Sequence, residues 1–145
     1  MKILKISIVL IAFSLASGCR RAGALKEKSD RNMRVQVARM TPVTPKDDMA
    51  VYRVRLIPSE ILRTIHKELG SEHYWYRMDS CFYLDHAGHK QYPVVLQPVA
   101  NGSKDNYEYL LQFVREMPSD SSDSVRFVFA DKAINDIKYE FNLAF

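Results

Sequence analysis

Two histidines and one carboxylate fall within the five-residue run 85–89, as Asp85, His86 and His89. Imidazole and carboxylate groups are common zinc ligands and common general acids and bases. A zinc site needs three or four ligands, however, and no HExxH or CxxC motif supplies the others. The two remaining histidines fall in other predicted elements. We therefore interpret the run as a polar hairpin tip, and we expect neither a metal nor another cofactor.

Nucleophilic catalysis has little support in the sequence. Cys81 lies within a predicted strand, without the helix N-terminus or adjacent cation that lowers a thiol pKa. No Gly-x-Ser-x-Gly motif and no phosphate-binding glycine loop is present. Glu108 and Glu116 show no spacing typical of a catalytic carboxylate pair. We expect Cys81 to be a buried structural thiol, and we expect the protein not to be an enzyme.

The best candidate for a binding site surrounds the only tryptophan, Trp75. If Tyr74 and Tyr76 point into the core of a strand-based domain, alternation places Trp75 on the opposite face with His73 and Arg77. An outward tryptophan beside an arginine is typical of interaction hot spots and of platforms on which sugars stack. The alternative interpretation is that Trp75 is covered by another part of the chain, because large aromatic side chains are usually buried.

The N-terminus has the three regions of a signal peptide. Lys2 and Lys5 provide a basic start, residues 6–15 are almost entirely apolar, and small residues follow up to Cys19. The apolar run is too short for a spanning helix, which needs roughly 18 residues or more. The run LASGC at residues 15–19 resembles the lipobox of bacterial lipoproteins.

This resemblance covers residues 1–19 alone, and Ala16 stands where leucine is most common in that family. It implies that residues 1–18 are removed and that Cys19 carries a diacylglyceryl group and an amide-linked acyl chain such as palmitate. Two or three acyl chains anchor a soluble domain almost irreversibly. Arg20 is not the aspartate that retains some lipoproteins at the inner membrane, so the outer membrane is preferred over the inner one. The alternative is an ordinary secreted protein cut near Cys19.

Charge is concentrated behind this predicted anchor. Without residues 1–18 the net charge falls from +4 to +2, because Lys2 and Lys5 are lost with them. Most charged residues from Cys19 to Met40 are basic. We expect residues 19–32 to form a basic, flexible tether. Nucleic acid is not an expected partner, because no recognisable binding motif is present and the chain is predicted to be exported.

The remaining residues, 33–145, are predicted to form one β domain. The length of 145 residues excludes two large domains, and a hydrophobic fraction of 47% allows a packed core. Period-two alternation predicts about seven strands. Their apolar residues fall in seven groups: Met33 to Val37, Tyr52 to Leu56, Tyr74 to Leu84, Tyr92 to Leu96, Tyr107 to Phe113, Val125 to Phe129, and Ile137 to Phe145.

One segment, near 59–70, breaks this alternation. Ser59 is a good N-cap, the following apolar residues have helical spacing, and Gly70 is a good terminator. One short helix cannot cover seven one-sided strands, so two sheets must cover each other. We expect an antiparallel β-sandwich, immunoglobulin-like or transthyretin-like, with one amphipathic helix. The last strand also resembles the terminal strand of an outer-membrane barrel, but seven strands of this length do not fit a barrel.

These features favour a lipid-anchored protein of the bacterial cell envelope that binds another envelope protein without catalysis. It would act as a scaffold or as an accessory component of an envelope-spanning assembly, such as a secretion or conjugation system. The alternative is a lipoprotein that binds a glycan or a small ligand through Trp75 and nearby aromatic residues. In both hypotheses the lipidated Cys19 attaches the domain to the membrane.

Overall fold

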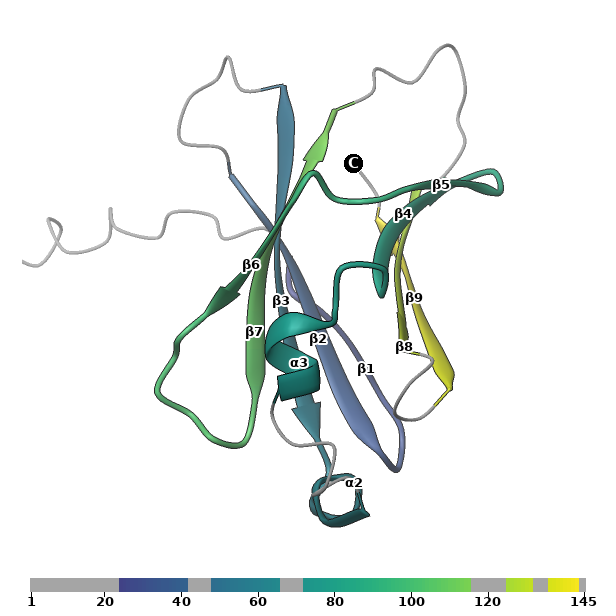
Figure 1. The fold of residues 1–145 in the computed structure, drawn as a ribbon. Coiled ribbons are helices and arrows are strands. Elements are labelled where there is room, and N and C mark those ends of the chain that lie inside the picture. Colours follow the sequence, from purple (N-terminus) through teal and green to yellow (C-terminus); the bar gives the residue numbers. More distant parts are fainter. Residues whose placement is uncertain (1–23, 42–47, 66–71, 116–124, 132–135, 144–145) are drawn as a thin grey trace, which may run out of the picture.

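The computed structural model describes residues 24–41, 48–65, 72–115, 125–131 and 136–143 (Figure 1). These residues form nine strands and two short helices. Along the chain they are β1 (Lys26–Ser29), β2 (Met33–Met40), β3 (Met49–Pro58), α2 (Glu60–Ile65), α3 (Glu72–Tyr76), β4 (Phe82–His86), β5 (His89–Gln91), β6 (Val95–Val99), β7 (Tyr107–Val114), β8 (Val125–Asp131) and β9 (Ile137–Leu143).

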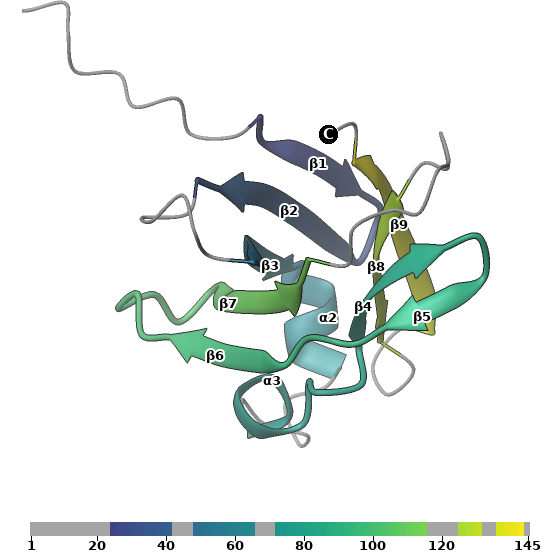
Figure 2. The same cartoon turned by 90° about the horizontal axis from the view of Figure 1, so that it is seen from above.

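The strands form two antiparallel sheets that pack against each other, as the β-sandwich prediction requires. The five-stranded sheet has the order β1-β2-β3-β7-β6, and the four-stranded sheet has the order β5-β4-β8-β9. Figure 2 shows the two sheets side by side, with β1 of one close to β9 of the other. Every strand pair is antiparallel.

The core confirms most of the predicted alternation. Met33, Val35 and Val37 of β2 are buried, with arginine and glutamine between them. The predicted inward residues of β3 and β8 are also buried, and so are most of those of β7 and of β9 within the described range. Aromatic rings dominate the interior. The ring of Phe127 contacts Tyr52 and Phe113 from the five-stranded sheet and Phe82 and Phe141 from its own.

The strand predicted from Tyr74 to Leu84 is wrong in its first half, because residues 72–76 form α3 instead. Tyr74 and Met78 are both buried, whereas Tyr76 between them is 79% exposed. A separation of four residues places two side chains on one face of a strand and also on one face of a helix. Alternation therefore did not distinguish the two structures, and only β4 from Phe82 onwards is a strand.

The predicted strand from Tyr92 to Leu96 is also shifted. Tyr92 and Val94 are exposed and lie between β5 and β6, and only Leu96 packs against the core. The helix predicted near 59–70 is present as α2. Its first turn is capped as expected, because the Leu62 amide donates a hydrogen bond of 3.1 Å to the Ser59 hydroxyl. Residues 66–70 lie outside the described ranges.

The five-stranded sheet begins inside the range 19–32, for which the sequence predicts a flexible tether. Lys26–Ser29 pair along their whole length with β2. Lys26 donates a hydrogen bond to the Asn142 carbonyl of β9, and the Lys28 ammonium lies 5.9 Å from the centre of the Phe141 ring. β1 therefore closes one side of the sandwich. The lipobox and residues 19–23 lie outside the described ranges.

Candidate functional site

The segment that contains Trp75 is helical, so its three predicted site residues do not share one strand face. Trp75 is partly buried, and its ring meets Tyr107 edge to face at 5.9 Å. His73 and Arg77 are four residues apart, and both line a pocket of about 270 Å³. Trp75 is absent from the residues that line it. The structure thus brings His73 and Arg77 together at a cavity and separates Trp75 from it.

The pocket lies where β8 ends and β4 begins. Its lining residues come from α3 and the segment after it, from β4 and β5, from the segment after β5 and from the end of β8: His73, Arg77, Ser80, Cys81, Tyr83, Lys90, Tyr92, Ala130 and Asp131. Seven of these residues lie between 73 and 92, whereas Ala130 and Asp131 come from the distant strand β8. Strand pairing assembles them, because Phe82 pairs with Phe129 and the Ala130 amide donates to the Cys81 carbonyl.

Charges of both signs line the pocket. The Asp131 carboxylate is buried, and its Oδ1 lies 3.7 Å from Nε2 of His73. Arg77 and Lys90 are exposed, and the Lys90 ammonium lies 4.9 Å from the centre of the Tyr83 ring. Tyr92 packs beside Tyr83 at 5.8 Å between ring centres. The pocket therefore combines a buried carboxyl group, two exposed basic side chains and two phenol rings.

Cys81 is buried, as predicted, although it lies in the turn before β4 and not within a strand. Burial, together with the nearby carboxylates of Asp131 and Asp79, raises the pKa of its thiol to about 11. The thiol is therefore protonated at neutral pH. Cysteine, histidine and aspartate together resemble a catalytic triad in composition, but a nucleophilic cysteine needs a lowered pKa. The electrostatics of this site act in the opposite direction.

His86 and His89 face each other across the β4–β5 hairpin, whose turn is formed by Ala87 and Gly88. The carboxylate of Asp85 accepts a hydrogen bond of 2.8 Å from the Gly88 amide. It also forms an ion pair with Arg126, with 2.8 Å between nitrogen and oxygen. This is the hairpin tip expected from the sequence. Among the described residues, no three histidine, cysteine, aspartate or glutamate side chains gather closely enough to hold a metal ion.

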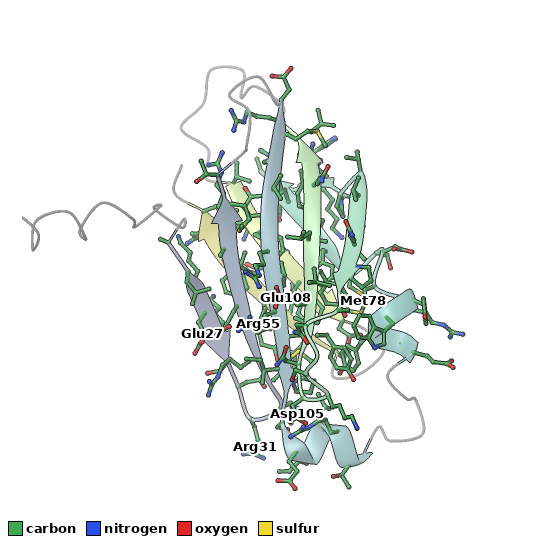
Figure 3. The ribbon with its side chains drawn as sticks, turned by 90° about the vertical axis from the view of Figure 1, so that its left-hand side faces the viewer. Glu27, Arg31, Arg55, Met78, Asp105 and Glu108 are labelled. Atoms are coloured by element: carbon green, nitrogen blue, oxygen red, sulfur yellow. The ribbon has the colours of Figure 1, made fainter. Side chains whose placement is uncertain are left out.

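A second candidate surface is the outward face of the five-stranded sheet. Glu108 of β7 is only 1% exposed although it points away from the core, because Arg53 and Arg55 of β3 cover it. Arg55 Nη2 lies 3.0 Å from Glu108 Oε2, and Arg53 binds the other carboxylate oxygen. Figure 3 shows Arg55 and Glu108 near the centre of this face.

The pKa of Glu108 reflects two opposed effects. Burial raises it, but hydrogen bonds from Arg53 and Arg55 outweigh burial and hold it below its usual value. Glu108 is therefore ionised at neutral pH. The side chains of both arginines remain nearly half exposed. No pattern in the sequence predicted this cluster, because Arg53 and Glu108 are 55 residues apart.

Apolar side chains continue this face toward the start of β3. We call them the apolar rim: Met40, Val51, Val95, Leu110 and Val114. Strand register aligns Met40, Val51 and Val95 in one row across four strands, with Gln112 of β7 between Val51 and Val95. Met40, Val95 and Val114 are among the exposed large hydrophobic residues of the protein. The sequence contains a partial signal for the rim. Alternation places the apolar side chain of Val51 on the outward face, because Tyr52 and Val54 point into the core.

Comparisons with known proteins do not assign a function to this chain. No protein-family model, no curated protein and no solved structure matches this chain. In the ranges that the structure describes, neither helix is long and apolar enough to cross a membrane. The two surfaces above, together with the sequence of residues 1–19, are therefore the basis for a functional proposal.

Proposed function

We propose that this protein is a lipid-anchored lipoprotein of the bacterial cell envelope, and that its β-sandwich binds another envelope protein without catalysing a reaction. The anchor is supported by the run that ends at Cys19. Six residues separate Cys19 from Lys26, where β1 begins. Such a segment spans at most about 25 Å, so an anchored domain stays close to the bilayer surface.

The outward face of the five-stranded sheet is the observation that carries the binding proposal. It combines the apolar rim with the half-exposed side chains of Arg53 and Arg55. Exposed apolar patches next to arginine are typical of protein interfaces. The complementary partner surface has an apolar centre and carboxylates that pair with the two arginines. Confinement to a membrane raises the effective concentration of the domain for a partner in the same membrane.

Substitutions on the apolar rim test this function. Val114→Glu places a charge on the rim of the outward face, and we expect it to abolish chemical crosslinking of the protein to a stoichiometric envelope partner in intact cells. Ile61→Glu is the matched control, because Ile61 is an exposed apolar residue on α2, away from the rim. Crosslinks that survive Val114→Glu, or that both variants lose equally, would contradict the binding face.

The anchor has its own test. Cys19→Ala removes the sulfur to which the diacylglyceryl group is attached, so the protein is expected to move from the membrane fraction to the soluble envelope fraction. Mass spectrometry of the N-terminal peptide checks the acyl chains on Cys19 directly. Density-gradient separation of the membranes tests the preference for the outer membrane. An unmodified N-terminus in the native protein would refute the anchor.

A further inference from the structure

We propose that the pocket at His73 and Arg77 binds a small hydroxylated carboxylate the size of one sugar ring, such as a hexuronate. This site lies outside the sheet face assigned to the protein partner, and it does not depend on the lipid anchor. The proposal stands on the volume of the cavity, on the arrangement of its charges and on the polar and aromatic groups that line it.

The volume limits the ligand to one ring. The cavity measures about 270 Å³, just below the range of about 300–1,000 Å³ that is typical of sites for drug-sized ligands. A disaccharide or a peptide would therefore extend out of it. A monosaccharide fits, and so does a hydroxylated acid of similar size.

The charges favour a single negative group on that ring. Arg77 and Lys90 are exposed, and within the described residues neither forms an ion pair with a carboxylate. The one carboxylate of the lining, Asp131, is fully buried beside His73. The exposed part of the lining is therefore positive, with a planar guanidinium that matches a carboxylate in two hydrogen bonds.

The remaining lining suits hydroxyl groups. Ser80 is exposed and has a hydroxyl that both donates and accepts. His73 adds a buried Nε2 that has no hydrogen-bond partner among the described residues. Tyr92 is 47% exposed and presents a ring on which the apolar face of a sugar can stack. A plain aromatic acid would leave most of these polar groups without partners.

Calorimetric titration of the detergent-solubilised full-length protein tests the proposal with three probes. Glucuronate has the ring, the hydroxyls and the charge, glucose lacks the charge, and acetate lacks the ring. We expect saturable binding of glucuronate, with glucose and acetate at least tenfold weaker. No saturable binding of glucuronate would overturn the proposal. If acetate binds as tightly as glucuronate, the site recognises anions in general and the proposed specificity for a sugar acid is wrong. If glucose binds as tightly as glucuronate, the negative charge does not contribute to binding and the proposal is also wrong.

Variants locate the binding. Arg77→Gln and Lys90→Gln are each expected to weaken glucuronate binding at least tenfold, and Tyr92→Leu severalfold. Lys104→Gln removes the same charge from an exposed loop that does not line the pocket, and it should leave the affinity unchanged. Thermal melting verifies that each variant is folded. Unchanged affinity in Arg77→Gln would place glucuronate elsewhere and refute the pocket, whereas the Cys19→Ala protein is expected to bind as the native protein does.

Discussion

Backbone conformation at single residues is most informative in the β4–β5 hairpin. Ala87 has a φ of 48° and Gly88 a φ of 92°, so both turn residues are in left-handed conformations. Two such residues between a cross-strand pair form the turn that matches the twist of a β-hairpin. Glycine adopts this conformation freely, but alanine has a Cβ that makes it unfavourable. The hairpin therefore contains one residue that costs stability.

Ala87→Asn is expected to stabilise the protein by about 0.5–1 kcal/mol, because asparagine tolerates a positive φ better than alanine does. Chemical denaturation of both proteins measures the difference. Ala100→Asn is a control for the added amide in an exposed loop and should change stability little. A loss of stability in Ala87→Asn would show that the methyl group of Ala87 stabilises the fold by more than its backbone strain destabilises it.

A second residue-scale prediction concerns Cys81. Its raised pKa leaves little thiolate, and its side chain is buried, so the folded protein should react with iodoacetamide at pH 8 at least tenfold more slowly than free cysteine. The Cys19→Ser variant makes Cys81 the only thiol to be measured. Denaturation in urea should restore the ordinary rate. Rapid alkylation of the folded protein would contradict the structural assignment of this thiol.

Among the elements, β3 and β7 are joined by side chains as well as by backbone pairing. Arg55 and Glu108 are paired residues in the register of these two strands, and Arg53 reaches the same carboxylate from two residues earlier. Removal of one partner of such a cluster leaves buried polar groups without compensation. The outward face of the sheet thus gains a fixed arrangement of two arginines at its centre.

Glu108→Gln is expected to destabilise the fold by about 1–3 kcal/mol at pH 7, because three hydrogen bonds from the two arginines lose their charged acceptor. The folded-state pKa of Glu108 lies below its ordinary value of 4.5, so its stabilisation is complete above about pH 4.5 and disappears as pH falls through the folded-state pKa. The variant should therefore lose less stability between pH 6 and pH 3 than the native protein. Urea denaturation across this range gives both slopes, and parallel slopes would exclude the contribution of Glu108.

At the scale of the whole molecule, aromatic side chains join the two sheets. The ring of Phe127 lies 5.6 Å from Tyr52 and 6.4 Å from Phe113 in the five-stranded sheet, and 6.3 Å from Phe82 and from Phe141 in the four-stranded sheet. A side chain shared by both layers couples their stability. At one edge of the sandwich, Lys26 and Lys28 of β1 contact β9.

Phe127→Ala is expected to cost about 3–5 kcal/mol, since it opens a cavity between the sheets as well as removing buried apolar surface. This is a large part of the total stability of an ordinary domain. Urea denaturation measures it, with Tyr76→Ala as the control because Tyr76 is exposed. A cost below about 1 kcal/mol would mean that the two sheets repack around the missing ring.

The sequence by itself determined the class of the fold. Burial of one face of a strand requires apolar residues at every second position, and this alternation is visible in the sequence. The buried residues of β2, β3 and β8, and most of the predicted inward residues of β7 and β9, follow from alternation alone. Ser59 as a helix cap and the hairpin around Gly88 follow from local side-chain and backbone preferences.

Only the tertiary structure decided between helix and strand at positions where the spacing fits both. It also decided which distant residues meet. Tyr74 and Met78 fit both periods, and packing of Tyr74 against Tyr107 accompanies the helix there. The partners Arg53 and Glu108 are 55 residues apart, and the pocket joins His73 to Asp131. Such contacts depend on strand order and register, which no local pattern encodes, so both candidate sites became visible only in the folded chain.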